Sequence, residues 1–490
     1  MTFRRNEADR EPPGKLGGSF HCQLPIADCQ FLEMALGNKS AIGNRQSAIT
    51  MDSLTYTQLL RRNRSFRRLW SGQVISELGN WFNFIAALGL VRVVSHAAAE
   101  VTTILLISRL VPFTLFAPLA GAFVDRWSRR TVMIVTDLLR VVIALGFLLV
   151  RRPEDLWLAY LCTAALSFVG TFFEAAKNAA VPNITGERDL LAGNALMFSS
   201  RFLLMSVGAA LGGWTAAHVG YHAAFIINAF SFVVSAYSVW LVPEKDTRSQ
   251  SNGVAVDQPR SLYRGYWSDV REGWAYIATH APVATIIGMN ILWATGGGAM
   301  NLIADRLGAL VFSGDNGISP DSAVAAFYFA GGLGLFIGMI IARRVGGFFE
   351  LKKRTVGFIG WSLFVQGLFY AATGLMPTLF AACVMVCISR VLLGAEFAVQ
   401  ETLMMRLVPD YLRGRVSTSD RAAEMMIWTF STAVAGWSLH AITPRTLTVI
   451  SGVLSGTAGL AWLVLFATQR VRLPKKISGH SYTQITTDQV

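Results

Sequence analysis

The sequence predicts an all-α integral membrane protein with twelve transmembrane helices in two pseudo-symmetric six-helix bundles. Three observations lead to this expectation: the composition, a series of twelve apolar runs, and a repeat that relates the two halves of the chain. Of the 490 residues, 53% are hydrophobic and only 15% are charged, whereas soluble domains carry about 25% charged residues. Because so few charged side chains cannot coat soluble domains of this total size, most of the chain is expected to lie in lipid.

The apolar runs have the length that membrane spans require. A bilayer core about 30 Å thick needs about 20 apolar residues per helix, because no backbone group can be left unpaired in hydrocarbon. Polar residues interrupt the first run, and three consecutive glycines interrupt the seventh. The twelve expected spans cover residues 70–94, 103–123, 132–150, 156–179, 196–216, 222–242, 283–304, 322–342, 355–374, 378–402, 424–442 and 446–468.

The net charge of +13 is distributed unevenly over the gaps between these spans. With an even number of spans, both termini lie on the same side of the membrane. The gaps and flanks on that side contain 28 Lys and Arg residues, whereas those on the opposite side contain four, namely Arg151, Arg152, Arg306 and Arg445. The positive-inside rule then predicts a multi-pass protein of the cytoplasmic (inner) membrane with both termini in the cytoplasm. The positive charge is interpreted as a topology signal with affinity for the headgroups of the lipid bilayer, and no nucleic-acid partner is expected.

Polar segments divide the chain into five expected parts. Residues 1–60 are expected to be a disordered or mis-annotated N-terminal extension with a basic lead-in, and translation is expected to start at Met51. Residues 243–281 are expected to be a cytoplasmic linker, in which 264–280 has the pattern of an amphipathic helix at the membrane surface. The other parts are an N-terminal six-helix bundle over 61–242, a C-terminal six-helix bundle over 282–468 and a cytoplasmic tail over 469–490.

A repeat relates the two halves of the chain. The segment Gly121–Arg130 corresponds to residues 346–355, where Glu350 takes the place of Asp125 and Arg354 that of Arg129. At the ends of the fourth and tenth spans, Glu174 before Val181-Pro182 corresponds to Glu401 before Val408-Pro409. Because both landmarks recur at nearly the same offset and at equivalent spans, they indicate a six-plus-six duplication, which is common in transporters.

The segment Gly121–Arg130 has a composition suited to a tight gap between two helices. Glycine permits close backbone approach, an acidic side chain can bind the positive end of a neighbouring helix, and arginines can bridge to acids or headgroups. We expect a cytoplasmic gating loop that holds the two halves together in one state and releases them in another. Its residues are Gly121, Asp125, Arg126, Arg129 and Arg130, with Glu350 and Arg354 in the second copy.

The same five residues match a known signature. Gly121, Asp125, Arg126, Arg129 and Arg130 fit the pattern G-x-x-x-D-R-x-x-R-R, so the chain resembles the major facilitator superfamily over residues 60–470, and this resemblance implies the major facilitator fold. More narrowly, residues 60–81, 182–194 and 208–232 look like the drug-efflux branch that includes macrolide and enterobactin exporters. Antiporters of this superfamily commonly carry G-P-x-x-G-G in the fifth span, where this chain has Ala209 in place of proline.

Charged groups inside the spans each need a partner or a function, because they cost at least about 2.5–3.5 kcal/mol to insert. Asp137 and Arg140 are three positions apart on one helix and can pair locally, either as a brace or in transport. Glu174 and Glu401, near the cytoplasmic ends of their spans, suit snorkelling to the membrane surface, a latch or proton transfer. The full set comprises Glu77, Asp137, Glu174, Glu396 and Glu401 against Arg92, Arg109, Arg140, Arg201 and Arg390.

Glu77 is the first candidate for a protonatable group. It shares one helix face with Gln73 and Asn80, so that face is expected to look into a central cavity; a fixed ion pair to another span is the alternative. Arg390, near the middle of the tenth span, is a candidate for the substrate or proton site. The expected cavity lining is Glu77, Asn83, Asn290, Trp293, Arg390 and Gln400, and Gly334 with Gly338 is expected to mark close helix packing.

Together these features predict a secondary active transporter rather than an enzyme, with no metal and no cofactor. The family resemblance implies proton-coupled efflux of a small amphipathic molecule, such as a drug-like compound or a siderophore, by alternating access of a monomer. An uncoupled facilitator or a lysophospholipid flippase of the same fold is the first alternative. A membrane enzyme or sensor is the second, and it is disfavoured because the seven histidines lack metal-binding spacing.

Overall fold

The computed structural model describes residues 56–124, 126–247, 262–314, 317–351, 354–468 and 471. By contacts between Cα atoms the chain divides into residues 1–53 and 54–490, and all described residues belong to the second unit. Every regular element within these ranges is helical. Nearly all of the expected extension over 1–60, the expected start at Met51 and nearly all of the tail over 469–490 lie outside the described residues.

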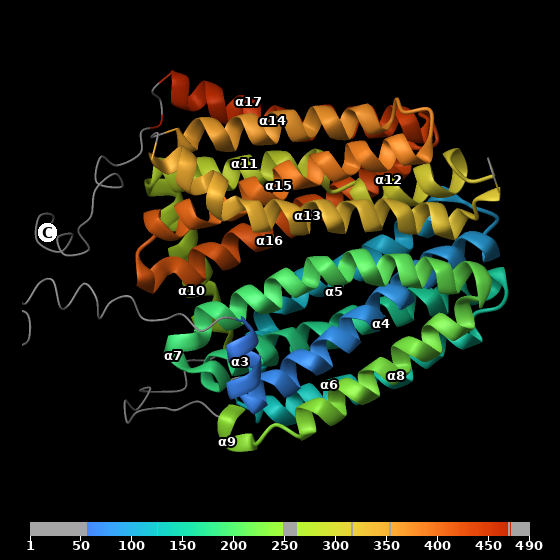
Figure 1. The fold of residues 1–490 in the computed structure, drawn as a ribbon, viewed down its shortest axis with the longest axis horizontal. Helices are drawn as coiled ribbons and strands as arrows, with labels where there is room; N and C mark the ends of the chain where they lie inside the picture. Colours follow the sequence, from blue (N-terminus) through green and yellow to red (C-terminus); the bar gives the residue numbers. More distant parts are fainter. Residues whose placement is uncertain are drawn as a thin grey trace, which may run out of the picture. The chain divides into compact units, whose positions relative to one another are not determined.

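The helices up to residue 247 form a first bundle, in which α7 packs against α4, α5 and α6 while α8 packs against α4 and α6 (Figure 1). The short α3 and α9 pack against α7 at one end of this bundle, which we call the α3 end. The elements are α3 (Tyr56–Arg62), α4 (Arg64–Val94), α5 (Ala99–Val124), α6 (Arg129–Gly146), the 3₁₀ turns η1 (Phe147–Leu149) and η2 (Pro153–Asp155), α7 (Leu156–His218), α8 (Tyr221–Trp240) and α9 (Glu244–Thr247).

The helices from residue 281 onward form a second bundle, in which α15 packs against α13 and α14 while α17 packs against α11 and α14. The polar helix α10 packs against α16 and α11. The opposite end of the bundles, where α12 lies, is called the α12 end (Figure 1). The elements are α10 (Leu262–Thr279), α11 (Ala281–Gly297), α12 (Met300–Arg306), the π-helical turn η3 (Leu307–Val311), α13 (Pro320–Leu351), α14 (Thr355–Thr373), α15 (Leu379–Leu407), α16 (Asp410–Ser438) and α17 (Pro444–Ala467).

The packing pattern of the first bundle recurs in the second. In the first bundle α4 packs on α8, α6 on α8 and α5 on α7, and in the second bundle α11 packs on α17, α14 on α17 and α13 on α15. The two main contacts between the bundles are equivalent in the same sense, because α7 packs on α13 and α5 packs on α16. The arrangement of the helices therefore has the pseudo-symmetry that the sequence repeat indicates.

The surface of the bundles is suited to lipid. Large apolar side chains lie exposed on helices of both bundles, including Phe230 (65% exposed) and Trp437 (77% exposed), and large exposed apolar areas are rare on soluble monomers. In the described ranges, eleven helices are long and apolar enough to cross a membrane. The span predicted at 424–442 falls in α16, which is long enough but more polar, so this measure gives one helix fewer than the twelve predicted.

Several helices extend beyond the predicted spans, and α7 and α16 do so most clearly. The helix α7 runs through the gap predicted between the fourth and fifth spans, and its backbone leaves the helical region at Gly186, where φ is 71°. The helix α16 begins at Asp410, before the apolar residues of its span. Hydropathy predicts the part of a helix that lies in lipid, whereas backbone hydrogen bonding continues the helix into the polar region.

Glycines permit the closest helix contacts within the second bundle. A Cβ atom placed on Gly334 or Gly338 of α13 would lie 2.4 Å from a backbone carbonyl oxygen of α15. Side chains larger than hydrogen would therefore force α13 and α15 apart, and the close packing expected of this pair is present.

Candidate functional site

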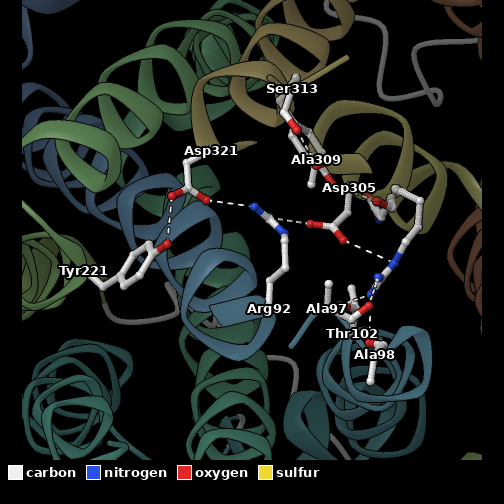
Figure 2. A network of polar contacts seen from close by, with 12 residues as sticks. Arg92, Ala97, Ala98, Thr102, Tyr221, Asp305, Ala309, Ser313 and Asp321 are labelled. Carbon is white, nitrogen blue, oxygen red and sulfur yellow. Dashed lines mark hydrogen bonds and ion pairs between the residues drawn. The ribbon is translucent and has the colours of Figure 1, made fainter. Parts of the chain in front are cut away.

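A buried network of charged side chains joins the two bundles at the α12 end (Figure 2). Its first-bundle members are Arg92, near the C-terminus of α4, and Tyr221, the first residue of α8. Its second-bundle members are Asp305 and Arg306, the last two residues of α12, and Asp321 in the first turn of α13. These five residues are called the arginine–aspartate network.

Arg92 binds one carboxylate from each of two second-bundle helices. Its Nη2 atom donates to Oδ1 of Asp305 at 2.6 Å, and its Nη1 atom donates to Oδ1 of Asp321 at 3.0 Å. The hydroxyl of Tyr221 donates to Oδ2 of Asp321 at 2.8 Å. Because Arg92, Asp305 and Asp321 are all buried, these charge-assisted hydrogen bonds are shielded from water and are stronger than surface pairs.

Arg306 adds a second connection between the bundles. Its Nη1 atom donates to the carbonyl oxygen of Ala97 at 2.7 Å, and its Nη2 atom donates to that of Ala98 at 3.0 Å and to the hydroxyl of Thr102. His96 and Ala97 have φ angles of 52° and 65°, a region that residues other than glycine seldom adopt. The link between α4 and α5 is therefore held in a strained conformation, and Arg306 binds its carbonyl groups.

Sequence reasoning missed most of this network. Arg92 was one of the intramembrane charges, but Arg306 was expected in a solvent-facing gap, and this expectation is wrong. Arg306 is 1% exposed and lies within the continuous helical segment Ala281–Val311. The signal was the adjacent Asp305-Arg306 pair with apolar residues on both sides, because opposite charges can neutralise each other inside an apolar run.

In the first bundle, the polar face of α4 meets charged groups of α5 and α7. Asn80 Nδ2 lies 3.4 Å from Oε2 of Glu77, and Lys177 Nζ lies 2.6 Å from Oε1 of Glu174 and 3.4 Å from Oε1 of Gln73. The charges of Arg109 on α5 and Arg201 on α7 both act on Glu77, and Arg201 also acts on Glu174. Glu77 is therefore half-buried in a mixed-charge environment.

An aromatic group lies where α4 meets α13. Phe84 and Trp81 of α4 each contact Tyr328 of α13, with ring centroids 5.4 Å and 5.6 Å apart. The guanidinium carbon of Arg109 lies 4.1 Å from the centre of the Phe84 ring, which is a cation–π distance. This group extends from the charged cluster of the first bundle to the second bundle.

A cavity of about 30 Å³ lies beside this aromatic group. Met205 of α7 contributes to one wall, and the other walls come from α12, η3, α13, α14 and α15. Arg390 of α15 lines the cavity, with its guanidinium carbon 5.0 Å from the Tyr370 ring centre and its Nη2 atom 2.5 Å from Sδ of Met300. Glu396, also on α15, is 2% exposed, and its Oε1 atom has no hydrogen-bond partner among the described residues.

The structure brings together two of the predicted lining residues, Asn290 and Gln400. Gln400 Nε2 donates to Oδ1 of Asn290 at 2.9 Å, and Asn290 Nδ2 lies 3.2 Å from each carboxylate oxygen of Asp420. Trp293, one turn further along α11, packs edge to face with Trp428 of α16 at 5.7 Å. Sequence reasoning missed Asp420, because it precedes the apolar part of α16.

Other predicted residues interact within one bundle or have an unpartnered polar atom among the described residues. Asp137 Oδ1 and Arg140 Nη1 pair at 3.2 Å within α6, and the guanidinium of Arg140 lies between the rings of Phe173 and Phe232. This arrangement suits a brace inside the first bundle. Asn83 is buried, and its Oδ1 atom has no hydrogen-bond partner in the described ranges. Glu401 is half-buried, and the charges of Arg421 and Glu424 act on it.

The predicted gating loop lies at the α3 end. Arg129 donates to the carbonyl oxygen of Ala179 at 2.9 Å, and Arg130 donates to that of Trp240, so both bind their own bundle. Gly121 and Arg126 are exposed, and Asp125 lies outside the described residues. In the second copy, Glu350 Oε1 pairs with Arg406 at 2.5 Å, and Arg354 is the exposed N-cap residue of α14.

Two similarly packed bundles of apolar helices, joined across a buried charged network, are the architecture of a multi-pass membrane protein. A family model described as the Major Facilitator Superfamily matches residues 69–416. The chain belongs to this superfamily.

The curated relatives include transporters with export named as their function. The uncharacterized MFS-type transporter YfiS of Bacillus subtilis is 27% identical over 221 residues, which cover 45% of this chain and 50% of that protein. The putative bacilysin exporter BacE of Bacillus subtilis is 29% identical over 228 residues, 45% of this chain and 54% of that protein. The chain thus spans about half the length of these relatives. Macrolide efflux protein A of Streptococcus pyogenes is 22% identical over 360 residues, 72% of this chain and 83% of that protein.

Solved structures share the fold. The nucleoside transporter NupG has a TM-score of 0.62 at 13% identity, covering 82% of this chain and 99% of that chain. A bacterial homologue of the iron transporter ferroportin, solved in an inward-facing state, has a TM-score of 0.58 at 14% identity, covering 81% of this chain and 98% of that chain. At such identities the likeness concerns the fold alone.

Proposed function

We propose that the protein is a secondary active exporter of the cytoplasmic membrane, which moves a small amphipathic molecule outward in exchange for protons by alternating access. The observation that carries this proposal is the arginine–aspartate network, because it joins the bundles at one end through Arg92, Asp305 and Asp321. A latch of this kind keeps one end of a central pathway closed, and its release is the step that an alternating mechanism requires.

The distribution of Lys and Arg supports an orientation with the α3 end in the cytoplasm. In that orientation the conformation with the network intact is the one closed to the outside. The hydrogen bonds of Arg129 and Arg130 to their own bundle fit a gating loop in its released state. Because both bundles belong to one chain, the proposed functional unit is a monomer.

Glu77 is the proposed proton carrier. It lies among the charges of Arg109 and Arg201, so gaining or losing a proton changes the electrostatic balance beside the contact between α4 and α13. A proton at Glu77 and a substrate in the cavity would both act on the contact between the bundles, and two ligands that shift one equilibrium are thermodynamically linked. Glu396 is the second candidate, because a neutral carboxyl group costs less to bury than a carboxylate without a partner.

The relatives and the cavity lining support a small amphipathic substrate. Macrolide efflux and bacilysin export are functions named for two relatives. One methionine from each bundle and aromatic side chains of the second bundle line the cavity, and such adaptable apolar walls suit the apolar body of a solute.

Proton release from everted membrane vesicles tests the proposal. Vesicles that contain the protein are acidified inside and given, one at a time, a macrolide, a catecholate siderophore and a lysophospholipid. The expected result is proton release with at least one compound, and loss of that release in Glu77→Gln. The matched control is Glu154→Gln, which neutralises an exposed carboxylate in the turn before α7. Normal release in the Glu77 variant would rule out that residue as the carrier.

One observation favours an uncoupled facilitator or a lysophospholipid flippase as the second candidate. Ala209, where antiporters of the superfamily commonly carry proline, is fully buried in α7. Flux that persists unchanged when a protonophore collapses the proton gradient would select this candidate over the exporter.

A further inference from the structure

We propose that Arg390 binds the carboxylate group of the transported molecule, so that the substrates are amphipathic carboxylates. This inference rests on the proposed function, because it assigns a substrate class to the same pathway between the bundles. It is carried by the surroundings of one buried arginine and by the cavity that this arginine lines.

Arg390 is a buried positive charge without a negatively charged partner among the described residues. Arg390 is 4% exposed, and its guanidinium group contacts the sulfur of Met300 and the ring of Tyr370. An arginine side chain stays charged in proteins. A buried charge is costly unless a counter-charge and hydrogen bonds compensate it, so this site is complete only when an anion is bound.

The other buried arginines in the described ranges have such compensation. Arg92 pairs with Asp305 and Asp321, Arg140 pairs with Asp137, and Arg306 binds backbone carbonyl groups and contacts Asp305. The fold therefore neutralises buried guanidinium groups where they brace helices or join the bundles. The exception is the arginine that lines a cavity.

The cavity has room for the anionic group. Its volume is about 30 Å³, and a water molecule needs about 10–15 Å³ on this measure. The space thus holds about two water molecules, which is comparable to one carboxylate group. A guanidinium group and a carboxylate are both planar and can form two parallel hydrogen bonds, which favours a carboxylate over a spherical anion.

The remaining lining defines the rest of the substrate. The residues around Arg390 are predominantly apolar, including Met205, Ile303, Leu307 and Phe327. Met205 belongs to α7 of the first bundle, so the cavity lies between the bundles and would widen if they separated. A molecule that satisfies both parts of this surface carries one carboxylate on an apolar body.

The neighbouring charges leave Arg390 without compensation. Asp305 and Arg109 both act on Tyr328, which lines the cavity, but Asp305 is already paired with Arg92. Glu396 lies on the same helix as Arg390, but no ion pair joins them among the described residues, and Glu396 Oε1 has no hydrogen-bond partner there. The positive charge of Arg390 is therefore available to an anion in the cavity.

Three dansyl compounds with the same fluorophore and different charges test the proposal. The full chain in lipid nanodiscs is titrated with dansylglycine, which is anionic, dansylamide, which is neutral, and dansylcadaverine, which is cationic. Dansylglycine is expected to bind about tenfold more tightly than dansylcadaverine, as a charge-assisted pair predicts. In Arg390→Met the dansylglycine affinity should fall by about tenfold, with dansylamide binding unchanged, because the charge is lost while the side-chain volume is kept.

Two further variants separate recognition from folding. Arg390→Lys keeps the charge but not the two parallel hydrogen bonds, so it should retain part of the preference for dansylglycine. Arg445→Gln removes a guanidinium of the same bundle, one that binds the carbonyl groups of Gly374 and Met376 outside the cavity, and it should bind as the unmodified chain does. Equal affinity for the three compounds in the unmodified chain, or equal losses in Arg390→Met and Arg445→Gln, would overturn the proposal.

The proton-release assay distinguishes failure of this inference from failure of the proposed function. Proton-coupled transport of cationic or neutral compounds, with no preference for anions, would contradict the proposed carboxylate substrates but would still support the proposed export function. Tight dansylglycine binding that depends on Arg390, without proton release for any compound, supports the anion site and contradicts the coupled exporter.

Discussion

Arg92 connects three helices through a single guanidinium group. It extends from α4 and donates to carboxylates of α12 and α13, at 2.6 Å and 3.0 Å. Arg306 lies 3.4 Å from the second oxygen of Asp305, so Asp305 has one charge partner from each bundle. Removing Arg92 would leave Asp321 with the hydroxyl of Tyr221 as its remaining hydrogen-bond donor in the described network.

We therefore expect Arg92→Gln to destabilise the folded protein by about 3–5 kcal/mol, the usual cost of breaking a buried pair. Combining it with Asp305→Asn should cost less than the sum of the two single changes. Each single change leaves one buried charge without its partner in the Arg92–Asp305 pair, whereas the double change removes both charges of that pair. Thermal unfolding of the four proteins of this double-mutant cycle, purified in detergent, measures the coupling. Additive losses would show that the two residues act independently.

Residue by residue, the sequence predicts local pairs better than distant ones. Asp137 and Arg140 are three positions apart, and helical spacing alone brings them together. Asn290 and Gln400 were placed in one lining because both are polar positions within apolar runs, and they are hydrogen-bonded. Arg92 and Asp305 are more than two hundred positions apart, and one sequence contains no signal that pairs them.

At the scale of single elements, α14 shows how glycine sets the distance between helices. A Cβ atom on Gly367 would lie 2.5 Å from the Cα atom of Gly456 on α17, whereas a Cβ atom on Gly357 would meet nothing within 4 Å. The two glycines lie on the same helix, but Gly367 packs against the backbone of α17 and Gly357 has open space beside it.

Gly367→Val should lower the stability of the folded protein by about 1–3 kcal/mol, because backbone atoms of α17 cannot move aside without separating the helices. Gly357→Ala on the same helix should be neutral or raise stability by up to about 1 kcal/mol, because alanine favours helix and finds open space. Thermal unfolding of both variants checks the difference. A Gly367 variant as stable as the Gly357 variant would contradict this account of the contact.

Helix boundaries were the least predictable feature at this scale. The apolar runs located α17 closely at both ends and α13 and α15 closely at their starts, but α13 continues to Leu351 and α15 to Leu407, beyond the predicted ends at 342 and 402. They did not predict the continuation of α7 to Gly186 or the early start of α16, because these segments are polar but still form backbone hydrogen bonds along the helix.

For the whole molecule, the contact between α7 and α13 is a second place where the bundles meet, apart from the arginine–aspartate network. A Cβ atom on Gly332 of α13 would lie 2.7 Å from the backbone nitrogen of Ser206 on α7. A large side chain at this position would act between the bundles rather than within one of them.

We expect Gly332→Leu to shift the equilibrium away from this conformation while each bundle stays folded. Spin labels at Val93 and Leu310, which are 61% and 50% exposed and belong to different bundles, report the separation at the α12 end. The distance between these labels should increase in Gly332→Leu and stay unchanged in Gly288→Leu, where a Cβ atom meets nothing within 4 Å. An unchanged distance in Gly332→Leu would show that α7 and α13 accommodate the side chain locally.

At this scale the sequence was most informative. Apolar runs and a repeated loop predict an all-α membrane fold with paired halves. Lipid permits few backbone structures apart from helices, and the internal repeat indicates that the second half folds like the first. The conformation adopted by the two halves could not be predicted, since it depends on contacts such as that between Gly332 and Ser206.

The arginine–aspartate network contains two arginines and two aspartates, so its formal charges sum to zero. The charges are divided between the bundles, however, because the first bundle contributes Arg92 alone and the second contributes Asp305, Arg306 and Asp321, with a sum of −1. The membrane voltage acts with about 2.3 kcal/mol per elementary charge at 100 mV on a charge that crosses the whole field. Separation of the bundles in the plane of the membrane should therefore be insensitive to voltage, whereas a shift of one bundle past the other along the membrane normal should depend on it.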